Sequence, residues 1–97
     1  GAEVVLNFSN NAVTQKHNWV LVQDGAKDTV STAGLLAAAT GWIPTDDERV
    51  LAYVGLLSPG GNGEVSFTAP AAGTYQFVCT FPGHNATMFG TFEVSTQ

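Results

Sequence analysis

The sulfur and imidazole groups of this chain gather in two short segments. Cys79, His84 and Met88 fall within ten residues, and His17, the only other histidine, stands just before an apolar run that begins at Trp19. A thiolate and two imidazoles in a trigonal arrangement, with a weak axial thioether, form the ligand set of an electron-transfer copper site. A cysteine at a strand end, followed by a loop that returns a histidine and a methionine, brings three ligands to one point. His17 is then the one candidate for the second imidazole, so the sequence predicts a site for one copper ion.

Other uses of the same residues remain open. A cysteine hydrolase would pair Cys79 with a histidine base, but no orienting third group or oxyanion hole is recognisable, and Met88 has no role in it. A structural zinc site needs four strong ligands rather than a thioether. A copper carrier or storage protein needs easy release of the metal, whereas buried ligands on a rigid scaffold favour retention. In a metal-free binding module, Cys79 and Met88 would simply fill the core, and their clustering with histidine would be chance.

Short strands would position these side chains. Val4, Leu6 and Phe8 alternate with polar residues, which is typical of a half-buried strand, whereas the continuous apolar run at 19–22 predicts a strand covered on both faces. Cys79 would end the fifth strand, on the face that Tyr75 and Phe77 share, with its side chain facing inward. Turn signals separate the runs and predict an antiparallel β-sandwich or barrel. Six strands are expected, at residues 3–9, 18–22, 50–57, 64–68, 75–79 and 91–95.

One segment breaks this strand pattern. The Ala and Leu content of residues 29–40 favours a helix, and Gly41 is a suitable residue to end it. An exposed acidic segment at 44–48 follows, and residues 58–63 form a loop by composition. The chain is therefore expected to be all-β with a short helical excursion.

The flanking residues of the ligand segments carry a family resemblance. Residues 17–22, 70–75 and 79–84 resemble the corresponding segments of the cupredoxins, the small blue (type 1) copper proteins, and are most similar to those of the azurin-like auracyanins. The spacing Cys-x4-His-x3-Met looks like the azurin-type ligand loop. The resemblance implies a Greek-key two-sheet β-sandwich. It also implies a one-electron carrier, with copper cycling between Cu(I) and Cu(II).

The resemblance assigns a role to each residue around the metal. It implies strong ligation by two imidazoles and a thiolate and weak axial ligation by a thioether, from His17, His84, Cys79 and Met88. Lys16 stands where azurins have glycine and is the candidate for a weak fifth contact through its carbonyl. Asn18 and Phe81 would donate backbone N–H groups to the Cys79 sulfur, which withdraws charge from the metal and raises its potential.

The same resemblance implies how electrons would leave. His17 is expected to be buried, and His84 is expected to expose one ring edge, surrounded by Phe81, Pro82, Gly83 and Phe89. A small apolar patch there suits short-lived docking of redox proteins such as cytochromes or membrane electron-transfer complexes. Asp46, Asp47 and Glu48 could steer a basic partner, although an ordinary solvated loop is the more economical reading of this cluster.

The composition excludes one class of partner, and the chain length limits the number of domains. The 97 residues carry 3 Lys and Arg against 8 Asp and Glu, a formal net charge of −5, which argues against nucleic acid because phosphate binding needs clustered basic side chains. The length allows one domain, residues 1–97, and the resemblance implies two strands before residue 3 that the domain is expected to lack. The family also implies an extracytoplasmic location (periplasmic or at the outer face of the membrane) and a carrier without a small-molecule substrate rather than an enzyme.

Overall fold

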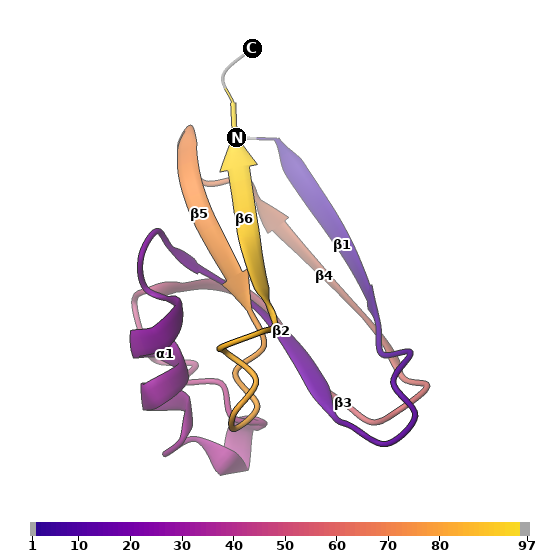
Figure 1. The fold of residues 1–97 in the computed structure, drawn as a ribbon. Helices are drawn as coiled ribbons and strands as arrows, with labels where there is room; N and C mark the ends of the chain where they lie inside the picture. The colour runs from indigo at the N-terminus through magenta and orange to yellow at the C-terminus, as the bar shows by residue number, and fades with distance from the viewer. Residues whose placement is uncertain (1, 96–97) are drawn as a thin grey trace.

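Two antiparallel sheets build the fold of residues 2–95, the part of the chain that this computed structural model describes (Figure 1). The smaller sheet pairs β1 with β4, and the larger has the order β3-β2-β5-β6. The strands are β1 (Glu3–Ser9), β2 (His17–Gln23), β3 (Val50–Leu57), β4 (Asn62–Thr68), β5 (Gly73–Val78) and β6 (Phe89–Val94). The prediction of an all-β two-sheet sandwich with six strands over this range is confirmed, and the expectation that the domain lacks two strands of the family stays a prediction.

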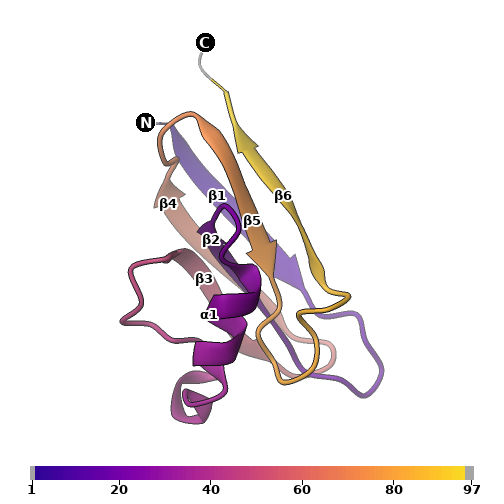
Figure 2. The same cartoon turned by 60° about the vertical axis from the view of Figure 1, so that its left-hand side comes forward.

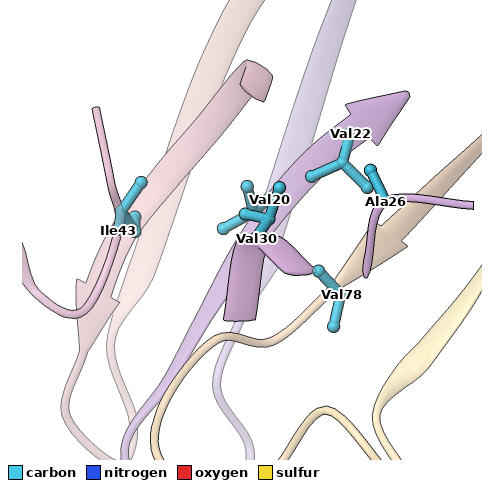
Figure 3. Packing of buried hydrophobic residues seen from close by; sticks show 6 residues of the cluster. All are labelled: Val20, Val22, Ala26, Val30, Ile43 and Val78. Carbon is cyan, nitrogen blue, oxygen red and sulfur yellow. The ribbon is translucent and has the colours of Figure 1, made fainter. Parts of the chain in front are cut away.

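Strand β2 lies at the centre of the larger sheet and is buried on both faces, as its continuous apolar run predicted. Leu21 points into the core between the sheets, where it packs with Trp19 and Val54 and with half-buried side chains of β1 and β4. Val20 and Val22 point to the opposite face. There the helical excursion covers them, and a second cluster forms from Val20, Val22, Ala26, Val30, Ile43 and Val78 (Figure 3).

The helical excursion differs from the single helix expected at 29–40. Helix α1 spans Lys27–Gly34, and a separate 3-10 turn η1 follows at Ala38–Thr40. Gly34 allows the chain to fold back at this point, because a Cβ there would lie 2.4 Å from the carbonyl oxygen of Trp42. The expected end at Gly41 is confirmed by its left-handed φ of 67°, a conformation that glycine adopts without strain. Figure 2 shows α1 beside the β5–β6 loop, on one face of the larger sheet.

Two further boundaries depend on contacts between distant segments. Strand β4 begins at Asn62, inside the predicted loop, because residues 62 and 63 pair with Ser9 and Phe8 of β1. Cys79 lies one residue beyond β5 rather than within it, at the start of the loop that leads to β6. No helix within the described range has both the length and the apolar character needed to span a bilayer.

Candidate metal centre

Three donor side chains meet at the end of the larger sheet. His17 begins β2, Cys79 follows β5, and His84 lies in the β5–β6 loop. Their donor atoms all lie within 4.8 Å of one another. The two Nδ1 atoms are 3.2 Å apart, and the Cys79 Sγ lies 3.5 Å from the His84 Nδ1 and 3.9 Å from the His17 Nδ1. The pair of imidazole nitrogens and the sulfur therefore form a compact triangle.

The size of this triangle suits a metal ion at its centre. Metal bonds of about 2.0 Å to nitrogen and about 2.3 Å to sulfur, 120° apart, place two nitrogens roughly 3.5 Å apart and a nitrogen and a sulfur roughly 3.7 Å apart. The observed separations of 3.2, 3.5 and 3.9 Å scatter around these values. One thiolate and two imidazoles in a trigonal set are donors that suit copper in both oxidation states.

Backbone hydrogen bonds hold the β5–β6 loop in a tight return. The Cys79 N–H donates to the Met88 carbonyl and the Met88 N–H donates to the His84 carbonyl, both at 2.9 Å. Gly83 has a φ of 84°, a left-handed conformation that lets the chain turn just before His84. Met88 is half-buried and lines the same cavity, of about 300 Å³, as Cys79 and Asn18. Axial ligation by the Met88 thioether stays a prediction.

Burial disfavours the charged forms of two of the donors, Cys79 and His84, when no metal is present. Burial raises the pKa of the Cys79 thiol, and the backbone N–H groups of Asn18 and Phe81 act in the opposite direction. Burial, followed by the proximity of His17, lowers the pKa of His84. Neutral imidazoles can ligate directly, whereas the thiol must lose its proton, so a metal cation that stabilises the thiolate suits this site.

A buried polar pair fixes the distance between the two ligand-bearing strands. Asn18 and Thr80 are 2% and 1% exposed. The Thr80 N–H donates to the Asn18 Oδ1 at 2.8 Å, and the Asn18 Nδ2 donates to the Thr80 Oγ1 at 2.9 Å. The same Nδ2 reaches the Gly41 carbonyl at 3.0 Å, and the Thr80 hydroxyl donates to the Trp42 carbonyl at 2.7 Å. Asn18 and Thr80 directly follow His17 and Cys79. They are therefore hydrogen-bonded to each other and to the end of the helical excursion.

The outer edge of the site is partly open. The His84 Nε2 faces away from the donor triangle and lies 2.8 Å from the Gln15 Oε1. Phe81 packs against the His84 ring with centroids 5.0 Å apart. Around it, Phe89 is 47% exposed, and of the other two residues of the expected patch Gly83 is exposed and Pro82 half-buried.

Two expectations near the metal are met less closely. His17 is half-buried rather than buried, because it is the first residue of β2, at the end of the sheet. Lys16 is exposed, and a contact of its carbonyl with a metal stays a prediction.

A sequence profile for the copper binding proteins of the plastocyanin/azurin family matches residues 2–95. The chain belongs to this family. It is 41% identical to Auracyanin-A of Chloroflexus aurantiacus over 98% of the chain and 60% of that protein, and 42% identical to Auracyanin-B of the same organism over 95% of the chain and 41% of that protein. An auracyanin structure from the photosynthetic bacterium Roseiflexus castenholzii superposes with a TM-score of 0.94 at 35% identity, covering 99% of this chain and 79% of that one. The chain thus spans 60% and 41% of the length of these two curated auracyanins, less than two thirds of either.

Membership of the plastocyanin/azurin family makes copper the cofactor, and the donor triangle is a possible site for one copper ion. Three residues that support it in this family member were not identified from the sequence, namely Thr80, Gln15 and Lys27. The Lys27 Nζ donates to the Asn85 carbonyl at 3.2 Å and lies 4.1 Å above the Phe89 ring, so α1 braces the ligand loop. A threonine, a glutamine and a lysine carry no periodic signal of such roles, because their partners lie 38 to 69 residues away.

Proposed function

We propose that this protein is a mobile one-electron carrier with a mononuclear type 1 copper centre. The observation that carries the proposal is the triangle of two Nδ1 atoms and one Sγ, with sides of 3.2 to 3.9 Å. His17, Cys79 and His84 would be the strong ligands, and Met88 the axial one. The bound copper would supply the change of oxidation state, and the protein would hold one geometry for both states.

Rigidity of the donors is what this chain contributes to that chemistry. The Asn18–Thr80 pair links β2 to the loop after β5, and the Cys79–Met88 and Met88–His84 backbone bonds close the loop on itself. Donors on such a frame move little when an electron arrives or leaves. The N–H groups of Asn18 and Phe81 beside the sulfur favour the electron-rich reduced site and so raise the potential.

The exposed edge of the loop is the proposed docking point. Gly83 and Phe89 offer a small, weakly polar surface beside His84, of the kind that suits the small interfaces of redox partners. The partners proposed are redox proteins such as cytochromes or membrane electron-transfer complexes, in an extracytoplasmic compartment. The net charge of −5 favours a partner with a basic face. Asp47 contributes little to this steering because Arg49 forms an ion pair with it.

A visible absorption spectrum after addition of Cu(II) to the purified protein tests the proposal. We expect an intense red-region band that ascorbate bleaches and air or ferricyanide restores over repeated cycles. The Cys79→Ser variant, with circular dichroism as the check that it is folded, should show no band. A folded wild-type protein without the band would refute the proposal.

Metal retention distinguishes the proposed electron carrier from the alternative, a copper carrier or storage protein. An electron carrier keeps its copper through many redox cycles in the presence of a Cu(I) chelator, because the donors are held by the fold whether or not they bind metal. Rapid transfer of Cu(I) to the chelator, at a rate comparable to that of reduction, would favour a copper carrier or storage protein instead.

A further inference from the structure

The side chain of Gln15 contacts the His84 nitrogen that faces away from the donor triangle. The His84 Nδ1 lies 3.5 Å from the Cys79 Sγ, while its Nε2 lies 2.8 Å from the Gln15 Oε1. A neutral imidazole has one N–H, and the nitrogen that faces a metal must present its lone pair. The proton therefore sits on Nε2, and the Gln15 amide oxygen accepts it.

A buried asparagine fixes the backbone from which Gln15 reaches His84. Asn10 is 2% exposed, and its Nδ2 donates to the Gln15 carbonyl at 2.9 Å and to the Leu57 carbonyl at 3.0 Å. Its Oδ1 accepts the N–H of Ala12 at 3.0 Å. The exposed Gln15 side chain thus extends from an anchored main chain, which reduces the conformational entropy lost in holding the contact.

We propose that Gln15 is a positioning residue of the copper centre, which holds the His84 ring with Nδ1 toward the metal and lowers the reduction potential. The proposal rests on the proposed function of the site. A histidine ligand usually donates its second N–H to a protein acceptor, which fixes the ring orientation and makes the ligand nitrogen more basic. A more basic ligand stabilises the more highly charged Cu(II) and so favours the oxidised protein. Gln15 thereby lowers the reduction potential, whereas the N–H groups at the Cys79 sulfur raise it.

The size of the effect follows from the strength of one hydrogen bond. A net contribution of about 1 kcal/mol corresponds to roughly a fivefold change in an equilibrium. If the bond acted in the oxidised state alone, its loss would raise the potential by about 40 mV, since a tenfold change is 59 mV for one electron. A rise of up to that size is expected.

Two substitutions remove the contact in different ways. Gln15→Asn keeps the amide but is too short to reach His84, and Gln15→Leu keeps the length but removes the acceptor. Thr14→Val is the matched control, because Thr14 lines the same surface hollow as Gln15 and the change adds apolar surface without touching the bond. The measurements are the reduction potential and the solvent exchange of the His84 Nε2–H by NMR in the diamagnetic Cu(I) protein.

We expect both Gln15 variants to show a higher potential and faster Nε2–H exchange, by up to about fivefold, with Thr14→Val unchanged. A rise in Gln15→Leu alone would indicate an effect of polarity and would overturn the proposal, as would exchange rates equal to those of the wild type. The same exchange measurement on the metal-free protein tests the contact independently of copper. Protection that depends on Gln15 there would support the positioning role even if the wild type failed to form a blue site, whereas its absence would refute it.

Discussion

Replacement of Thr80 by valine should destabilise the protein through hydrogen bonds alone. Valine has nearly the shape of threonine, so the packing around this 1% exposed side chain stays filled. The hydroxyl, however, accepts from the Asn18 Nδ2 at 2.9 Å and donates to the Trp42 carbonyl at 2.7 Å. Thr80→Val leaves the Asn18 Nδ2 and the Trp42 carbonyl without the hydroxyl as a partner, although Asn18 keeps its bond to the Gly41 carbonyl.

The expected cost follows from the burial of the orphaned groups. An unpaired buried donor or acceptor costs about 1 to 3 kcal/mol. The lower part of that range applies to the Trp42 carbonyl, whose bond to Thr80 is only partly buried. For the two groups together we expect a loss of about 2 to 3 kcal/mol in the free energy of unfolding, a large share of the roughly 5 to 15 kcal/mol typical of a domain.

Urea denaturation of the metal-free protein measures this loss, with an unchanged m-value as evidence that the unfolded state is not altered. Thr80→Ser is the control, because it keeps the hydroxyl and removes one methyl group, at about 1 kcal/mol. The reasoning fails if Thr80→Val is within about 0.5 kcal/mol of the wild type, the scatter of neutral substitutions, or if Thr80→Ser is the more destabilising of the two. Copper-loaded Thr80→Val should also lose its metal to a chelator faster than the wild type.

Two further predictions concern the frame around the site. Gly90→Ala should lower the free energy of unfolding by about 1 to 3 kcal/mol through overpacking, because its Cβ would lie 2.3 Å from the Phe77 ring. Gly55→Ala, where nothing lies within 4 Å, should be close to neutral in the same urea titration. The Arg49 guanidinium lowers the pKa of Asp47 from 3.8 to about 2, so the ion pair stabilises the fold above pH 3.8 and this stabilisation is lost as the pH falls toward 2. The free energy of unfolding of the wild type should exceed that of Asp47→Asn by about 1 kcal/mol at neutral pH, after allowance for solvent screening. A difference in this free energy that stayed constant down to pH 2 would contradict the reasoning.

Much of the fold was predictable because strands leave a local signal. The alternation of Val4, Leu6 and Phe8 placed β1, and the apolar run at 19–22 placed a strand buried on both faces, since each pattern needs only a few neighbouring residues. The helix boundaries were not predictable in the same way. Residues 29–40 have helical composition throughout, but α1 ends at Gly34, where Trp42 lies too close for any larger residue, and composition carries no record of that approach.

The donor chemistry of this protein follows from its amino-acid composition, because one cysteine, one methionine and two histidines leave few ways to assemble a metal site. The residue pattern also predicts the strands and loop that carry these side chains. The tertiary structure decided which nitrogen of each imidazole faces the triangle, and that Gln15 occupies the other nitrogen of His84. Ring orientation depends on side chains packed from segments up to 69 residues apart, and such pairings form only when the two sheets and the helical excursion come together.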